Sequence, residues 1–372
     1  MSTPSSLPPL VAMDVAGRAT RVREALAEHG AAGLLVTKPA NVRWLTGFTG
    51  SNSHALVTAD RLMVATDGRY RTQIADELDA AGVEAEVEIV VAALAGTLQR
   101  AIAPGERVGL EADHVTWSKQ RVFAEAWPDR ELVPTIGLVE ELRKHKDAGE
   151  RSRLERAAAM ADVALAEVAP TLGSGRTERE VARHLDSLMI EQGADGPSYD
   201  TIVASGPNGA LPHARPTDRV IEAHDLVVID VGARLDGYGS DMTRTFVAGA
   251  EPTERQRRLW DAVRDAQAAG VAAVADGVEI RHVDAVCRDV LARHDLAEFF
   301  IHGTGHGIGL EIHEDPILSA RTDGILRAGY VVTVEPGVYI AGEGGVRIED
   351  AVVVHPSGCE PITHSPKTPS LH

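Results

Sequence analysis

The sequence predicts an α/β (α+β) protein built from two domains. Its 372 residues are long for one ordinary domain. From Gly17 onward, stretches with helical spacing alternate with stretches typical of strands, as in an α/β layer. Between about 139 and 156 the chain becomes charged and strongly helical, which places the domain boundary near 145. We therefore expect a small N-terminal domain over residues 14–145 and a larger second domain over 146–364.

The first domain alternates helices and strands. Residues 18–30 have helical spacing and stop at Gly30, a residue that commonly ends helices. Residues 69–82 read as a second helix. Short apolar runs predict strands over 33–37, 54–58, 61–66 and 83–91. This order implies a mostly parallel or mixed sheet.

The second domain contains an internal repeat. Segments 177–180 and 253–256 each match a helix capping box, and apolar residues continue at helical spacing after both. Each helical stretch leads to a hairpin pattern that bears two acids. Asp230 and Asp241 flank the turn at 236–237, while Glu335 and Glu349 are equidistant from Gly342. The repeat suggests a pseudo-twofold domain in which four carboxylates converge.

Composition and charge exclude several classes of partner. A net charge of −18 argues against nucleic acid and anionic membranes, which select basic surfaces. The two cysteines, Cys287 and Cys359, form neither a disulfide framework nor a thiolate metal site and fit a reducing compartment. The N-terminal residues lack the features of a signal peptide, and the sequence has no apolar run long enough to span a membrane. We expect a cytoplasmic protein with disordered tails at 1–13 and 364–372.

The chemistry centres on one histidine and four acids in apolar or glycine-rich strand settings. They are Asp230, Asp241, His306, Glu335 and Glu349. An unpaired charge in such a setting costs several kcal/mol, and two divalent cations would balance four carboxylates. An oxygen-rich set with one imidazole suits Mn²⁺ or Co²⁺, with Zn²⁺ as a further candidate, and leaves room for a bridging hydroxide. A single strand aspartate could instead cap a turn or bind water.

Three further histidines and an arginine lie near these residues in the sequence. His302 belongs to the same glycine-rich segment as His306, His313 follows it, and His213 lies in a predicted loop. These histidines could hydrogen-bond substrate or stabilise an oxyanion, or they could be ordinary partly exposed residues. Arg347 precedes Glu349 by two positions, so it could orient a metal-binding carboxylate, bind a substrate carboxylate, or form a surface ion pair.

These residues stand in motifs that resemble those of the pita-bread metallopeptidases, which include methionine aminopeptidase, aminopeptidase P and prolidase. The motifs are IDVG with Asp230, SDMTRT with Asp241, HGTGHGIGLEIHE with His306, VEPGVY with Glu335 and RIED with Glu349. The resemblance covers about 146–362. It implies that the five residues bind two metal ions, that His213, His302 and His313 are catalytic or contact substrate, and that Arg347 supports the ligands.

The N-terminal half narrows the resemblance. Segments 41–52 (NVRWLTGFTGSN) and 66–73 (TDGRYRTQ) are similar to the N-terminal domain that aminopeptidase P and prolidase share with creatinase. The resemblance therefore implies a creatinase-like N-terminal domain, followed by a pita-bread catalytic domain. It also implies a homodimer in which this first domain helps to close the neighbouring subunit's site.

The function implied is hydrolysis of the bond between an N-terminal residue and a following proline, by an Xaa-Pro aminopeptidase. Glu335 would shuttle the proton, and His213 and His302 would stabilise the oxyanion or the leaving group. A strict Xaa-Pro dipeptidase is the close alternative. Two further alternatives are a catalytically inactive peptide-binding homologue and a creatinase-like amidinohydrolase that needs no metal.

Overall fold

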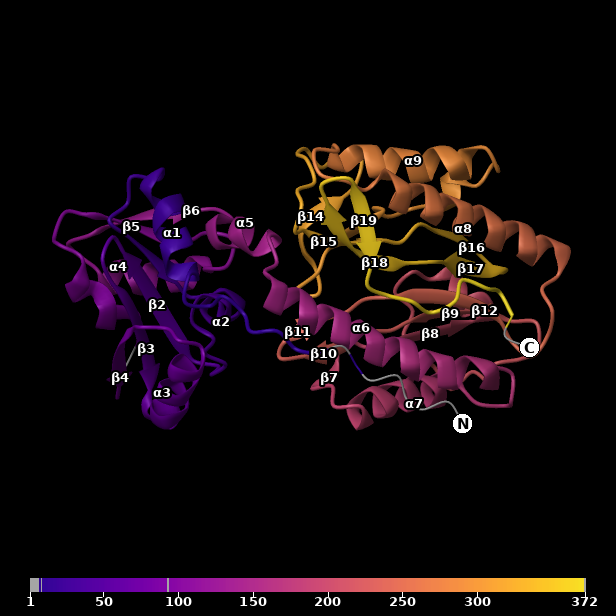
Figure 1. Cartoon of the computed structure of the whole chain (residues 1–372), viewed down its shortest axis with the longest axis horizontal. Coiled ribbons are helices and arrows are strands. Elements are labelled where there is room, and N and C mark those ends of the chain that lie inside the picture. Colours follow the sequence, from indigo (N-terminus) through magenta and orange to yellow (C-terminus); the bar gives the residue numbers. More distant parts are fainter. Residues whose placement is uncertain (1–6, 8, 92–93, 371–372) are drawn as a thin grey trace. The chain divides into compact units, whose positions relative to one another are not determined.

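In the computed structural model the chain divides into two compact units, one formed by residues 13–143 and one by residues 144–372 together with the N-terminal residues before 13. The structure describes residues 7, 9–91 and 94–370. The helices and strands of both units are labelled in Figure 1.

The first unit is a six-stranded mixed sheet with the strand order β4-β3-β2-β1-β5-β6. β1 pairs antiparallel with β2 and parallel with β5. The sheet is therefore mixed, one of the two arrangements that the sequence predicts. Short strands alternate with helices along the chain. The elements are α1 (Arg18–Ala27), β1 (Gly33–Val36), α2 (Pro39–Thr46), β2 (Ser53–Thr58), β3 (Leu62–Asp67), α3 (Arg71–Ala80), β4 (Glu86–Val90), β5 (Arg107–Glu111), α4 (Trp117–Ala126), β6 (Glu131–Thr135) and α5 (Leu138–Lys144).

His54 makes the stability of this unit depend on pH. Its ring packs against Phe123, with 5.4 Å between the ring centroids, and its Nδ1 atom is buried without a hydrogen-bond partner. Burial, followed by the charge of Lys119, lowers the pKa of His54 to about 4. The folded state therefore binds this proton less readily than the unfolded state, whose pKa is about 6.5.

We predict that this unit loses stability as the pH falls from about 6.5 towards 4, with full stability above that range. At pH 5 the loss from His54 amounts to about 2 kcal/mol. Urea unfolding of wild type and His54→Leu at pH 7.5 and pH 5.0 measures it. The variant should lose about 2 kcal/mol less than wild type between the two pH values. An equal loss in both proteins would show that His54 is not the group that titrates.

The second unit consists of two similar halves. In the first, α6 and α7 pack on the sheet β12-β9-β8, and in the second, α8 and α9 pack on the sheet β14-β13-β15-β18-β19. Figure 1 shows the two helix pairs on opposite sides of the strands. Both predicted capping boxes are confirmed, at the start of α7 by Thr177 with Glu180 and at the start of α8 by Thr253 with Gln256.

Each half of this unit contains one helix pair, one hairpin and further short strands. In the first half they are α6 (Ala148–Val168), α7 (Glu178–Glu191), β7 (Gly196–Pro197), β8 (Ile202–Ser205), β9 (Leu226–Asp230), β10 (Ala233–Leu235), β11 (Tyr238–Gly239) and β12 (Thr243–Val247). In the second half they are α8 (Glu254–Ala273), α9 (Ile280–Ala292), β13 (Gly305–Gly307), β14 (Glu314–Leu318), β15 (Val331–Val334), β16 (Gly337–Ile340), β17 (Gly344–Arg347), β18 (Asp350–His355) and β19 (Gly358–Pro361).

Both predicted hairpins are present, and each is broken midway into two ladders. In the first, β9 pairs with β12, and the chain then shifts into the separate ladder of β10 with β11. The turn at its tip is the predicted one, with Asp236 at φ 48° and Gly237 at φ 78°, values typical of a two-residue hairpin turn. In the second, β15 pairs with β18 and β16 with β17.

The two hairpins lie against each other through hydrogen bonds. The backbone N–H of Glu349 donates to the carbonyl of Thr243 over 3.0 Å. The Thr245 hydroxyl donates to the carbonyl of Arg347 and accepts from the Arg347 N–H, over 2.9 and 3.0 Å. These contacts bring the acids of the first hairpin next to those of the second.

The prediction of a disordered C-terminal tail is wrong for residues 364–370. The Ser365 N–H and hydroxyl both donate to Asp162 on α6, and the Ser365 carbonyl accepts from the buried Arg244. Lys367 pairs with Asp350. Composition predicted disorder, but buried charged partners fix this segment. In the predicted N-terminal tail, Val11 hydrogen-bonds to Ser152 and Arg153; residues 1–6, 8, 371 and 372 lie outside the described residues.

Candidate metal centre and active site

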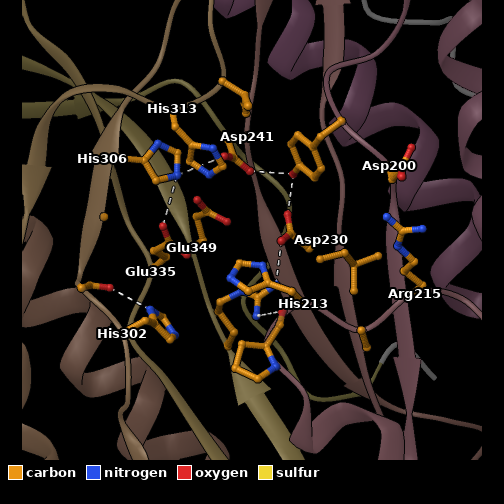
Figure 2. A pocket seen from close by; sticks show the side chains of 18 of the residues that line it. Asp200, His213, Arg215, Asp230, Asp241, His302, His306, His313, Glu335 and Glu349 are labelled. Carbon is orange, nitrogen blue, oxygen red and sulfur yellow. Dashed lines mark hydrogen bonds and ion pairs between the residues drawn. The ribbon is translucent and has the colours of Figure 1, made fainter. Parts of the chain in front are cut away.

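A cavity of about 460 Å³ in the second unit collects every residue that the sequence singled out. Figure 2 shows all of them except Arg347 labelled around it, together with Asp200 and Arg215. The nine predicted residues that line it are His213, Asp230, Asp241, His302, His306, His313, Glu335, Arg347 and Glu349.

The four acids lie where the two hairpins are broken. Asp230 is the last residue of β9, and Asp241 precedes β12. Glu335 and Glu349 occupy the corresponding breaks, after β15 and before β18. Because a break interrupts the alternation of side chains, it lets residues of both hairpins turn towards a common centre. The pseudo-twofold arrangement of the hairpins thus places two acids from each half at the cavity.

The carboxylates are crowded and poorly compensated by the protein. Asp241 and Glu349 are 5% and 1% exposed. Burial, together with neighbouring carboxylates, raises the pKa of both well above the ordinary range. Thr243 donates to Oε2 of Glu349 over 2.7 Å, but Oε1 of Glu349 is buried and has no hydrogen-bond partner. An unsatisfied carboxylate oxygen among other acids is a place for a cation.

His306 presents one ring nitrogen to these acids. Its Nδ1 lies 3.0 Å from the carbonyl of Gly307, which can only accept, so Nδ1 carries the proton. Nε2 then faces Glu335 Oε1 at 3.3 Å and Asp241 Oδ2 at 3.6 Å. Burial alone lowers the pKa of His306, but Glu335 and Asp241 outweigh it and raise the pKa to about 9. Nε2 is therefore the nitrogen that a cation shared with the two carboxylates would take, in place of the proton that they hold there. Metal-binding histidines use this arrangement, with the other ring nitrogen donating to a carbonyl.

Arg347 supports the site, and four of its five N–H donors bind groups of the protein itself. The Arg347 side chain is 3% exposed and forms an ion pair with Asp230. Its Nη2 donates to Asp230 Oδ2 over 2.6 Å. Nη1 donates to the Tyr339 hydroxyl and to the carbonyl of Pro212, and Nε donates to Thr243. Among the three roles that the sequence left open, this geometry matches the orientation of a site carboxylate.

His302 is engaged inside the protein. Its Nδ1 lies 2.7 Å from the carbonyl of Gly303 and must donate there, so Nε2 accepts from the Tyr339 hydroxyl at 2.8 Å. Burial lowers the pKa of His302 and keeps the ring neutral. Both ring nitrogens are occupied, so the geometry favours a positioning role for His302 over the oxyanion contact predicted from the sequence.

His213 and His313 are the predicted histidines whose rings remain available within the described part of the chain. Both are exposed to the cavity. The ring of His313 meets the ring of His306 edge-on, with 4.4 Å between the centroids. The neighbouring carbonyl of Pro212 is held by Arg347, which ties the loop carrying His213 to the acid cluster.

Sequence reasoning missed two tyrosines. The Tyr199 hydroxyl contacts Asp230 Oδ1 and, at 2.6 Å, Asp241 Oδ1; burial raises its pKa well above the ordinary value, so it stays a donor. Tyr339 links His302 to Arg347. Tyr339 ends the motif VEPGVY that carries Glu335, but the sequence does not show which groups its hydroxyl contacts. Tyr199 lies in a loop before β8, outside the motifs of the acids, so no local signal marks it.

The donor set fits divalent cations. One nitrogen or oxygen atom from each of Asp241, His306 and Glu349 lies within 4.8 Å of the others, and the remaining acids line the same cavity. The unpartnered oxygen of Glu349 and the Nε2 atom of His306, which faces two carboxylates, both point to a cation at this place. Oxygen-rich sites with one imidazole are typical of Mn²⁺, Co²⁺ and Zn²⁺.

Comparison with known proteins agrees with this geometry. The model of metallopeptidase family M24 matches residues 152–356, and that of the creatinase/prolidase N-terminal domain matches 18–145. An Xaa-Pro dipeptidase from Pyrococcus furiosus is 34% identical, over 89% of this chain and 92% of its own. Within the described residues, no helix is both long and apolar enough to cross a membrane.

Solved structures of two relatives share the whole fold. The structure of an Xaa-Pro dipeptidase from Bacillus anthracis has a TM-score of 0.90 and 39% identity, and covers 95% of this chain and 99% of that one. An X-Pro aminopeptidase from Thermotoga maritima has a TM-score of 0.84 and 34% identity, and covers 93% and 99%. The resemblance read from the motifs is confirmed: this chain is a hydrolase of metallopeptidase family M24, with a creatinase/prolidase N-terminal domain and a pita-bread catalytic domain.

Proposed function

We propose that this protein is an Xaa-Pro dipeptidase, which hydrolyses dipeptides whose second residue is proline. The observation that carries the proposal is the convergence of nine predicted residues on one cavity of about 460 Å³, a size suited to a small ligand. Relatives named Xaa-Pro dipeptidase, similar over nearly the whole chain, favour the dipeptidase over the aminopeptidase that the sequence placed first. The aminopeptidase remains the second candidate because of the Thermotoga maritima relative.

Two divalent metal ions, for which we propose Mn²⁺, would be held by Asp230, Asp241, His306, Glu335 and Glu349. Such ions, when bound, supply Lewis acidity towards the scissile carbonyl and activate water at neutral pH. The other steps fall to side chains of the chain itself.

Glu335 is placed to accept and return a proton. Burial alone raises the pKa of Glu335, but His306, His302 and Arg347 outweigh it and hold the pKa below its ordinary value. The carboxylate is therefore present at neutral pH. Its contact with His306 Nε2 at 3.3 Å places it at the edge of the acid cluster, next to the cavity.

His213 and His313 would contact the substrate at the scissile bond. Their ring N–H groups are the imidazole donors available in the cavity, so they can stabilise the developing oxyanion or protonate the leaving nitrogen. Proline makes this last step important, because its amide has no N–H and leaves as a secondary amine. His302 would act through Tyr339 by keeping Arg347 in place.

We predict that protein supplied with Mn²⁺ hydrolyses Ala-Pro, and that Ala-Pro-Ala is cleaved at least about 10-fold more slowly, because a site built for a free carboxylate rejects a longer chain. EDTA should abolish both activities. Liquid chromatography of the released alanine measures them, and metal analysis of protein purified without added metal identifies the native ion. Equal cleavage of both peptides would indicate the aminopeptidase, and cleavage that survives EDTA would contradict a metal-dependent peptidase.

A homodimer and a cytoplasmic location are also part of the proposal. They rest on the resemblance of the N-terminal domain and on cysteine usage, respectively. Light scattering of the purified protein and fractionation of cells that express it would test them.

A further inference from the structure

We propose that Arg215 binds the free carboxylate of the dipeptide substrate and so makes the enzyme select dipeptides. This inference rests on the proposed function and adds the residue that determines chain-length specificity. Arg215 lies on the loop between β8 and β9, lines the cavity and is exposed. Sequence reasoning did not single it out.

Arg215 is the cavity arginine with capacity for an anion. The other arginine among the lining residues, Arg347, is buried and donates to Asp230, Tyr339, Thr243 and Pro212. Within the described ranges, the guanidinium of Arg215 has neither a hydrogen bond nor an ion pair. Its donors are therefore free, in a planar arrangement that matches a carboxylate with two parallel hydrogen bonds.

The loop that carries Arg215 is fixed on both sides. On one side, the carbonyl of Pro212 accepts from Arg347 over 3.1 Å. On the other, the N–H and hydroxyl of Thr217 donate to Glu178 over 3.0 and 2.6 Å. Glu178 is fully buried and also accepts from Ser205. Because the backbone on both sides of Arg215 is already fixed, less conformational entropy is lost when Arg215 binds a ligand.

The charges around the cavity favour Arg215 as the partner of the substrate carboxylate. Of the five acids that line the cavity, four would be balanced by the two divalent ions. Arg347 is already paired with Asp230, so Arg215 is the lining arginine whose charge is available to a substrate carboxylate. In the view of Figure 2, Asp230 lies between His306 and Arg215, and Arg215 lies beside Asp200. A dipeptide whose scissile bond lies at the acid cluster could therefore direct its carboxylate to Arg215.

The test compares Ala-Pro with its amide, Ala-Pro-NH₂, in the Mn²⁺-loaded full-length protein. The two substrates differ in the carboxylate charge and are nearly equal in size. We expect wild type to prefer Ala-Pro, and Arg215→Ala to raise the KM for Ala-Pro by about 10- to 100-fold with little change in kcat. The KM for the amide should change by less than about 2-fold. Arg215→Lys, which keeps the charge but loses the paired donors, should fall between wild type and Arg215→Ala.

Arg179→Ala is the matched control, because Arg179 is also exposed but pairs with Asp218 away from the cavity lining. It should leave both KM values unchanged. The inference is overturned if Arg215→Ala changes both substrates equally, or neither, while wild type hydrolyses Ala-Pro. If wild type hydrolyses neither peptide, the proposed function itself fails, so the two failures are distinguishable.

Discussion

Asp241→Asn is expected to lower kcat/KM for Ala-Pro by at least about 10³-fold, the effect of losing several kcal/mol of metal-derived stabilisation. The same change should make the metal-free protein more stable. Asp241 is 5% exposed. Burial is the larger cause that raises its pKa well above the ordinary range, and the neighbouring carboxylates raise the pKa further. Replacing the carboxylate with a neutral amide removes that repulsion while the side-chain oxygen can still accept from Tyr199.

Thermal unfolding with and without Mn²⁺ separates these two effects. Wild type should gain about 2.7 kcal/mol from metal at 100 times its dissociation constant, and Asp241→Asn should gain much less. In EDTA, the variant should be more stable than wild type, because the neutral amide relieves the cost of burying Asp241 among other carboxylates. Asp218→Asn, an exposed acid that pairs with Arg179, should change neither measurement.

A destabilised, metal-free Asp241→Asn would contradict this account of the acid cluster. It would mean that the carboxylate makes a structural contact that outweighs the repulsion. Full activity in the variant would remove Asp241 from the proposed metal ligands.

The acids were predictable because each belongs to a local pattern. Asp230 and Glu335 follow apolar strand runs, and Asp241 and Glu349 precede them. Charge in such surroundings demands a partner, and the duplicated helix and hairpin pattern indicated that the partners would be one another. The breaks in the hairpins could not be predicted, because β9 to β12 read as two continuous strands around a turn.

The network around the acids was not predictable, since it depends on contacts between distant segments. Tyr199 reaches Asp230 and Asp241 from a loop. Tyr339 occupies Nε2 of His302, a residue that the sequence predicted to stabilise the oxyanion or the leaving group. The C-terminal tail shows the same limit. Its composition is typical of disorder, yet Arg244 and Asp162 bind Ser365 through hydrogen bonds that no sequence pattern reveals.

Arg347→Met is expected to destabilise the metal-free second unit by about 3–5 kcal/mol, the usual cost of removing one partner from a buried ion pair. Asp230 would lose a 2.6 Å hydrogen bond and the positive charge of its arginine partner. The carbonyl of Pro212 would lose its donor as well, which frees the loop of His213. We expect kcat to fall by about 10- to 100-fold, as for other residues that orient metal ligands.

Metal should reduce this loss of stability, because a bound cation gives Asp230 a new counter-charge. The unfolding free energies of wild type and Arg347→Met, each measured in EDTA and in Mn²⁺, provide the test. Arg219→Met is the control: Arg219 is partly buried and pairs with Asp225, with 3.0 Å between Nη2 and Oδ1, and neither residue lines the cavity. Its loss of stability should be the same with and without metal. If Arg347→Met loses the same unfolding free energy in EDTA and in Mn²⁺, then Arg347 acts by holding the Pro212 loop and not by balancing the charge of Asp230.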